Sequence, residues 1–424
     1  MNEKAVDLSP VRARFPALQE TDADGRPFVF FDGPGGTQVP QDVIDAMANY
    51  FRTANANHGG YFATSRRNDE IIDQAREAMA DFLNAPSPNE IVFGANMTTL
   101  TFSFSRAIGR LLKPGDEIIV TRLDHDANIS PWLALEEQGV KIRWADFNPE
   151  DCRLNLDSLA GLITDRTRLI AVGYASNAVG TINPIGRIAA LARDAGAWLW
   201  VDAVHYAPHG PIDVQTLGCD FLVCSAYKFF GPHVGVVWGR LDLLERLPAY
   251  KVRPAPGNPP HKFETGTLNH EGLAGVAAAV NYLAELGETY GPSAGLPPLD
   301  QYQGRRRSLK AAMHTIAAYE RPLFADMLAR IRQIPDITVY GITNPDQFDQ
   351  RCPTLAFTHA RFSPDHIARY LGDRGIFVWS GNYYALAVTE RLGVEESGGM
   401  VRVGLAHYNT QEEIDRLVVA LQEL

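Results

Sequence analysis

The stretch LWVDAVHYAPHGPIDVQTLGCDFLVCSAYKFFGP, residues 199–232, decides the fold. It contains two short apolar runs, residues 199–201 and 221–225, and turn-forming residues bound each of them. Such runs are typical of buried strands in an α/β sheet. Asp202 follows the first run and Lys228 follows the second. Both side chains are therefore predicted at the carboxyl ends of strands, where open α/β sheets bind their ligands.

An acid and a lysine in these places suit one cofactor. A carboxylate beside a pyridine nitrogen keeps that ring protonated, and a lysine amine forms a Schiff base with an aldehyde, so the pair can bind pyridoxal 5'-phosphate (PLP). For either residue alone, a turn cap at Asp202 or a solvated amine at Lys228 is the commoner explanation. The apolar strand before Lys228 and the sequence FFGP after it favour a partly buried amine. Burial lowers a lysine pKa and makes the amine nucleophilic.

The same stretch resembles the cofactor segment of the cysteine desulfurase family, within the class V aminotransferase group of fold-type I PLP enzymes. The likeness extends along most of the chain. It implies that Lys228 forms the Schiff base with PLP and that Asp202 faces the pyridine nitrogen. It also implies a homodimer with shared active sites.

Composition narrows the range of partners and locations. The chain has 424 residues, 46% of them hydrophobic and 21% charged, which is typical of a globular protein with a large core. A net charge of -11 and the lack of a basic run argue against a nucleic-acid partner. No apolar run approaches the ~20 residues of a membrane span, and the N-terminus lacks a signal-peptide core. We therefore expect a cytoplasmic protein with no membrane contact.

The order of elements predicts the architecture. Strand and helix alternate through the first two thirds of the chain, which favours a mostly parallel, seven-stranded-type sheet with helices on both faces and a smaller α+β C-terminal domain. The predicted division is an N-terminal segment packing with the small domain (1–30), a large PLP-binding domain (31–290) and the small domain (291–424). Among the predicted elements are helices at 41–53, 68–83, 185–197, 273–286, 300–334 and 364–373, and strands at 337–340 and 354–358.

A phosphate seat is predicted where the strand ending at Phe93 turns into a helix through GANMTT, residues 94–99. Free backbone N–H groups and the helix dipole favour an anion there. A simple helix cap by Asn96 or Thr98 explains the same residues. The resemblance implies phosphate contacts from the Met97 backbone and the Thr98 hydroxyl.

The resemblance implies further cofactor contacts. His125 would lie flat on the ring and assist proton transfer, and the amide of Asn177 would donate to the ring hydroxyl. His205 stands where the family usually has a glutamine that touches the same hydroxyl. Ser225 matches a phosphate-binding serine, and Tyr227 stands where many members have a histidine.

One implied contact crosses to a second subunit. Thr267 lies in the segment FETGTLN, and the family's similar segment reaches the phosphate of the neighbouring subunit through its threonine.

No metal site is predicted. His125 is flanked by acids, but no ligand pattern such as HExxH completes it. His205 and His209 share an HxxxH spacing, yet Pro208 makes a helix there unfavourable. The four cysteines, Cys152, Cys219, Cys224 and Cys352, show no CxxC spacing. Cys219 and Cys224 flank or lie in a predicted strand and are expected to be buried structural thiols.

The chain departs from the resembled family in one segment. The family's nucleophilic cysteine lies in a small-domain loop, and Tyr384 stands in its place within VWSGNYY, residues 378–384. Arg402 matches the arginine that clamps the substrate carboxylate, a task suited to a bidentate guanidinium. Trp379, Tyr383 and Tyr384 either line an aromatic pocket or serve packing.

These observations lead to a predicted function. We expect a PLP-dependent enzyme that acts on a small L-amino acid as a carbon–sulfur β-eliminating lyase or an aminotransferase, and not as a persulfide-forming desulfurase. The alternatives are cysteine desulfurase or selenocysteine lyase activity using another residue, such as Cys352 or Cys224, and a non-catalytic PLP-binding protein.

Overall fold

A seven-stranded sheet forms the centre of the larger part of the molecule. The computed structural model describes residues 6–424. The sheet has the order β2-β8-β7-β6-β5-β3-β4, and only β8 runs antiparallel to its neighbours. This architecture confirms the predicted fold-type I sheet. Its strands are β2 (Ile91–Gly94), β3 (Glu117–Thr121), β4 (Lys141–Ala145), β5 (Thr167–Gly173), β6 (Trp198–Asp202), β7 (Phe221–Ser225) and β8 (Gly235–Gly239).

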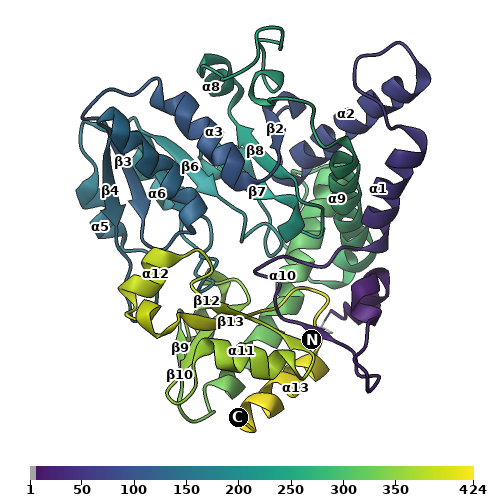
Figure 1. Ribbon diagram of the computed structural model, residues 1–424, viewed down its shortest axis with the longest axis vertical. Helices are drawn as coiled ribbons and strands as arrows, with labels where there is room; N and C mark the ends of the chain where they lie inside the picture. The colour runs from purple at the N-terminus through teal and green to yellow at the C-terminus, as the bar shows by residue number, and fades with distance from the viewer. Residues whose placement is uncertain (1–5) are drawn as a thin grey trace.

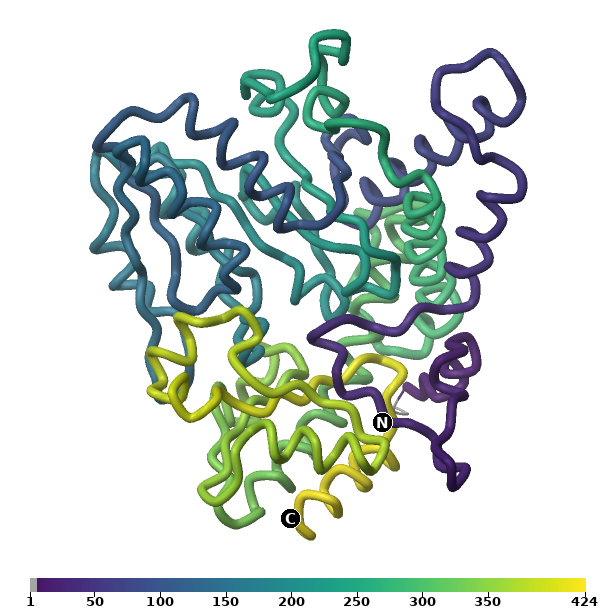
Figure 2. The backbone as a smooth tube through the Cα atoms, viewed as in Figure 1, coloured from purple at the N-terminus to yellow at the C-terminus, as the bar shows by residue number. Residues whose placement is uncertain are grey.

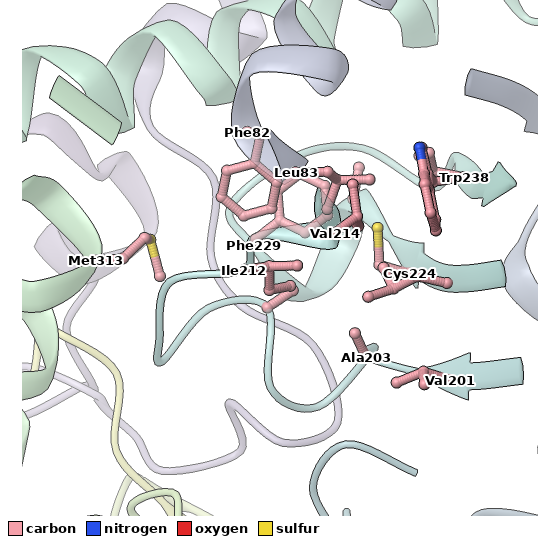
Figure 3. Close-up of a cluster of buried hydrophobic side chains, with 14 of the residues drawn as sticks. Phe82, Leu83, Val201, Ala203, Ile212, Val214, Cys224, Phe229, Trp238 and Met313 are labelled. Carbon is pink, nitrogen blue, oxygen red and sulfur yellow. The ribbon is translucent and has the colours of Figure 1, made fainter. Parts of the chain in front are cut away.

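Helices cover both faces of this sheet because its central strands are apolar on both sides (Figure 1). Alternate residues of β6 enter two separate clusters: Val201 packs with α6 (Ile185–Asp194), and Trp200 packs with α3 (Met97–Gly109). Figure 3 shows part of the first cluster, in which Cys224 lies near Val201. The shorter helices of this part are α4 (Ser130–Leu133), α5 (Leu156–Leu162), α7 (Val214–Leu217) and α8 (Leu241–Arg246).

Four long helices pack beside the edge of the sheet formed by β2 and β8 (Figure 1). Helix α9 (His270–Tyr290) contacts α1 (Gln41–Thr53), α2 (Ala63–Leu83) and α10 (Gly304–Ile331). The approach of α9 to α10 requires a glycine, since a Cβ at Gly287 would lie within 2 Å of a backbone oxygen.

A second, antiparallel sheet of order β12-β13-β10-β9 forms the C-terminal part. Helices α11 (Pro364–Gly372), α12 (Leu386–Arg391) and α13 (Gln411–Gln422) belong to this part, and a Thr410–Glu413 capping box begins α13. A two-stranded parallel pair joins β1 (Val29–Phe30) to β11 (Ile376–Phe377), so the N-terminal segment lies beside this sheet (Figure 2). The strands of the second sheet are β9 (Ile337–Tyr340), β10 (Thr354–His359), β12 (Trp379–Gly381) and β13 (Met400–Gly404).

Several helix ends differ from the predicted ones. Helix α1 has the predicted bounds, whereas α2 begins at Ala63 rather than at residue 68. Its first turn is largely polar, so apolar periodicity does not reveal it. Helix α9 exceeds the predicted 273–286 at both ends, and α10 is shorter than the predicted 300–334. Within residues 6–424 no helix is long and apolar enough to cross a bilayer. The predicted domain boundaries remain predictions.

Candidate active site

The carboxyl ends of five strands meet around a cavity of about 560 Å³, which we call the inner cavity. Strands β2, β3, β5, β6 and β7 run parallel, so the loops after them lie at one edge of the sheet. Every residue predicted to bind the cofactor lines this cavity except Thr267. They are Met97, Thr98, His125, Asn177, Asp202, His205, Ser225, Tyr227 and Lys228.

Lys228 lies in the 3-10 turn that follows β7. Its Nζ donates to the backbone oxygens of Pro34 and Gly35, the latter at 2.9 Å. Burial, followed by the nearby Arg402 charge, lowers the pKa of Lys228 to about 7. An amine with this pKa is substantially neutral near physiological pH and can act as a nucleophile or a base.

Asp202 is the last residue of β6 and is 7% exposed. Its Oδ1 accepts a hydrogen bond from the Val204 backbone N–H at 2.9 Å. Burial and, to a smaller extent, the nearby Asp124 charge raise the pKa of Asp202 to about 7. Asp202 forms no ion pair with any side chain of residues 6–424, so a bound cation such as a protonated pyridine would stabilise its charge.

The first turn of α3 provides an anion-binding end to the cavity. Asn96 caps this helix by accepting from the Thr99 N–H at 2.8 Å. The Met97 N–H donates to Ser225 Oγ at 3.1 Å, which brings the end of β7 beside the helix N-terminus. A thirteen-residue helix with a hydroxyl at its start has the donors and the dipole that bind phosphate. The cap and the phosphate seat are therefore compatible here.

His125 is held as a neutral ring in one tautomer. Burial lowers the pKa of His125 to about 4, and the Lys228 and Arg402 charges act in the same direction. Its Nδ1 accepts from the Ala127 N–H at 2.9 Å, so the neutral imidazole carries its proton on Nε2. Tyr384 stacks on this ring with 5.7 Å between ring centroids.

His205 and Asn177, two further polar residues of the inner cavity, already have protein partners. His205 Nε2 hydrogen-bonds Thr354 Oγ1 at 2.9 Å, and burial lowers its pKa well below the ordinary value. Asn177 Nδ2 donates to the Tyr383 backbone oxygen at 2.9 Å, while its Oδ1 is buried without a partner among the described residues. The predicted contacts of His205 and Asn177 with the cofactor hydroxyl remain predictions.

An outer cavity of about 1820 Å³ opens next to the inner one and shares Lys228, His125 and Tyr227 with it. Arg402, on β13, lines the outer cavity and is 4% exposed. Its Nη1 donates to the Asn177 backbone oxygen at 2.9 Å, and its Nε is buried without a partner among the described residues. A guanidinium with free donors in this position suits a substrate carboxylate.

The aromatic residues of the outer cavity divide between the two predicted roles. Trp379 and Tyr384 are 51% and 75% exposed and line the cavity. Tyr383 lies under the Arg402 guanidinium, 4.2 Å from it, and its hydroxyl donates to the Met400 backbone oxygen. Tyr383 therefore serves packing as well as the cavity wall.

Asp32 is a half-buried carboxylate that sequence reasoning missed. Its Oδ1 has no partner among the described residues, and burial raises its pKa to about 6 although the Arg402 and Lys228 charges lower it. A signal was present, because FVFFD ends an apolar run with an acid as LWVD does at Asp202. The glycines that follow Asp32 predict a tight turn, and that turn explains the segment without a role for the carboxylate.

Thr267 and His209 line neither cavity. Thr267 is exposed and lines neither cavity, so its predicted contact with a neighbouring subunit remains a prediction. His209 pairs with Glu320 on α10 at 2.9 Å, and no helix spans His205 to His209. Within residues 6–424 no three metal-ligating side chains gather at one place.

The residues of the inner cavity fit PLP. Asp202 provides a buried carboxylate, Lys228 provides an amine of low pKa, and the start of α3 provides phosphate donors. These groups line one cavity.

Comparison with known proteins gives matches along the whole chain. A family model described as aminotransferase class-V matches residues 29–290 and 306–417. Proteins named cysteine desulfurase from Pectobacterium atrosepticum and Yersinia pestis are each 34% identical over 433 aligned positions, which cover 98% of both chains.

Solved structures agree with these matches. The cysteine desulfurase CsdA of Escherichia coli is 28% identical with a TM-score of 0.82, over 98% of each chain. The cysteine desulfurase of Thermococcus onnurineus NA1 is 25% identical with a TM-score of 0.84, over 100% of this chain and 99% of that one.

These relatives contradict the prediction that the enzyme is a β-eliminating lyase or aminotransferase and not a desulfurase. That prediction rested on Tyr384 alone, whereas the similarity to cysteine desulfurases covers nearly every element that builds the two cavities. The comparisons support the alternative, an activity of the cysteine desulfurase or selenocysteine lyase type.

Proposed function

This chain belongs to the class V aminotransferase family of PLP-dependent enzymes, and on that premise we propose that it removes sulfur from L-cysteine to leave L-alanine. The observation that carries the proposal is the shared outer cavity of Lys228 and Arg402, in a chain similar along its length to cysteine desulfurases. L-selenocysteine is the second candidate substrate because its side chain differs only in the chalcogen atom.

The substrate would bind between the two sheets. Arg402 would hold the α-carboxylate through its free Nε and remaining Nη donors, with Tyr383 fixing the guanidinium from below. The α-amine would then point toward Lys228, which lines both cavities. This placement leaves the sulfur on the side of the outer cavity.

Bound PLP supplies an electron sink for the bond that breaks at the α-carbon. Asp202 would keep the proton on the pyridine nitrogen, since its buried carboxylate is stabilised by a cation. Lys228 Nζ, with a pKa near 7, would take the α-proton and return it. His125 Nε2–H would donate to the substrate or the ring beside it.

The remaining predicted contacts belong to the same proposal. Met97, Thr98, Ser225 and Tyr227 would hold the phosphate, while Asn177 and His205 would contact the ring hydroxyl. In the homodimer, Thr267 would reach the phosphate of the neighbouring subunit. The cytoplasmic location predicted from the sequence is also part of the proposal.

We also propose that Tyr384 takes the place of the sulfur-accepting cysteine of the resembled family. Its exposed ring lies over His125 at the outer cavity. A phenol cannot form a persulfide, so the sulfur would pass to a thiol other than one at this position.

Product analysis tests the proposed reaction. Purified holoenzyme is incubated with L-cysteine, or L-selenocysteine, and 2-mercaptoethanol, and alanine and pyruvate are measured by mass spectrometry. We expect alanine as the main carbon product, and we expect Lys228→Ala to abolish its formation.

The matched control is Lys251→Ala, which changes an exposed lysine outside both cavities and should leave the rate unchanged. Pyruvate as the main product, or no product from either amino acid, would overturn the proposal.

A further inference from the structure

Sulfur removal requires a thiolate, and none of the four cysteines can supply one in this structure. All four are at most 4% exposed, and none lines the inner or the outer cavity. Burial raises the pKa of Cys152 to about 12, and it raises the pKa values of Cys219, Cys224 and Cys352 as well. A buried thiol of raised pKa is an inert structural group.

The outer cavity has room for a second molecule beside the substrate. Its volume of about 1820 Å³ exceeds that of the inner cavity more than threefold. Phe102, Trp379 and Tyr384 form its apolar wall, and Lys228 lies at its inner end. A small molecule in this space would lie on the side of the bound substrate that faces away from the sheet.

Charge divides the outer cavity into two ends. Arg402 makes the inner end cationic, whereas Asp126, Asp365 and Glu395 lie elsewhere on the cavity wall. These three carboxylates, which we call the rim carboxylates, form no ion pair with any side chain of residues 6–424.

Neutral donors hold the rim carboxylates in place. Ser380 Oγ donates to Asp365 at 2.6 Å, Asn382 Nδ2 donates to Glu395 at 3.0 Å, and Ser130 donates to Asp126. Their charges are therefore fixed in position but not neutralised, so they would attract a cation and repel an anion.

We propose that the sulfur acceptor is a free small thiol that carries an ammonium group and enters through the outer cavity. An aminoalkane thiol without a carboxylate has this chemistry. The inference rests on the proposed function and adds the identity of the acceptor. It combines three observations: no accessible thiol in the described chain, space beside the substrate, and carboxylates without cationic partners.

The transfer balances without any further reagent. The acceptor thiolate sulfur forms a bond with the substrate sulfur, and the substrate Cβ–S bond breaks. The electron pair of that bond stays with the carbon skeleton, which takes up a proton and leaves as alanine. The sum is L-cysteine plus R–SH giving L-alanine plus R–S–SH, in which the carbon is reduced and the sulfur is oxidised.

The first test compares acceptors of similar size and different charge. The holoenzyme turns over L-cysteine, held at one concentration, with 2-(dimethylamino)ethanethiol, 2-mercaptoethanol or 3-mercaptopropionate. The tertiary amine is chosen because it cannot condense with the PLP aldehyde. We expect the rate of alanine formation to be about fivefold higher with the cationic thiol than with the anionic one at equal thiolate concentration.

The second test removes the rim charges. The double variant Asp126→Asn/Glu395→Gln keeps both hydrogen-bonding side chains, and it should abolish the preference for the cationic thiol. The matched control is Asp300→Asn, which changes an exposed carboxylate that lines neither cavity. This variant should keep the preference for the cationic thiol.

A binding measurement provides a readout that does not depend on turnover. PLP is fixed on Lys228 with borohydride, and calorimetry measures the affinity of each thiol for this reduced holoenzyme. The cationic thiol should bind more tightly to the wild type than to the double variant, and the anionic thiol should not.

The outcomes separate this inference from the proposed function. Alanine formed at equal rates with all three thiols, or sulfur found as a persulfide on an enzyme cysteine, would overturn the inference and keep the function. No alanine with any thiol would overturn the proposed function itself.

Discussion

The Lys228 amine lies among charges that act on it in opposite directions. Burial and the Arg402 guanidinium lower its pKa, whereas the carboxylates of Asp202 and Asp32 raise it. Asp202 already has a proposed task at the pyridine nitrogen, so Asp32 is the carboxylate left to balance Arg402. We infer that Asp32 positions the charge of Arg402 and sets the pH at which the Lys228 Schiff base loses its proton.

Removing the charge of Asp32 tests this role. A negative charge favours the protonated Schiff base, so Asp32→Asn should lower the pKa of that base, by about 0.5–1 unit. The pH titration of the cofactor absorbance measures it directly. Asp45→Asn, an exposed carboxylate on α1, should leave the titration unchanged. An unchanged or higher value in Asp32→Asn would contradict the inference.

Single residues of the site differ in how visible they are in the sequence. Lys228 and Asp202 follow apolar strands within one short stretch, so local pattern was enough to place them. Tyr384 and His125 stack although 259 positions separate them, and no local signal predicts that contact. The surroundings of Asp32 form where its chain segment crosses the end of β13 and Asp32 pairs with Gly404. No local sequence signal predicts that crossing.

At the scale of elements, the start of α3 and the end of β7 form one unit. The Met97 N–H donates to Ser225 Oγ, which fixes the hydroxyl beside the helix N-terminus. A phosphate bound at that N-terminus would lie next to this hydroxyl. The sequence predicted the helix start from the small and hydroxylated residues that follow the strand ending at Phe93, and it predicted β7 from its apolar run. It left the cap at Asn96 and the phosphate seat as alternatives, and the geometry allows both.

Loss of the Ser225 hydroxyl should weaken cofactor binding. We expect Ser225→Ala to raise the Kd for PLP about tenfold, because one hydrogen bond to a charged group, worth about 1.5 kcal/mol, is lost. Fluorescence titration of the apoprotein measures this. Ser105→Ala, a buried serine farther along α3, is the matched control and should change the Kd little. Equal affinities in Ser225→Ala and the wild type would exclude Ser225 as a phosphate ligand.

At the scale of the whole molecule, the active site lies between two sheets that come from distant parts of the chain. The loops of the seven-stranded sheet line the inner cavity, and the C-terminal part contributes Arg402, Asp365 and Glu395 to the outer one. The sequence predicted the first sheet from alternating strands and helices. The way the second sheet faces it depends on long-range packing, so the outer cavity and its charges could not be predicted.

The predicted homodimer can be tested through a residue that lies outside both cavities of the single chain. If Thr267 reaches the phosphate of the neighbouring subunit, Thr267→Ala should raise the Kd for PLP severalfold. The matched control is Thr265→Ala, two positions earlier in the same exposed loop. Sedimentation should show a dimer in both variants. A monomeric wild type, or equal Kd values in the two variants, would contradict the shared site.

The central claim is that this enzyme leaves the carbon of L-cysteine as alanine and passes its sulfur to a free thiol. Both fragments can be followed in one sample: excess holoenzyme is mixed with doubly labelled (3-13C, 34S) L-cysteine and an equimolar amount of 2-(dimethylamino)ethanethiol. The mixture is alkylated at once, because excess thiol would reduce a persulfide to sulfide. We expect [13C]alanine and an equal amount of 34S-persulfide on the small thiol, with unlabelled enzyme in the intact mass spectrum. [13C]Pyruvate, or 34S bound to a cysteine of the protein, would contradict it.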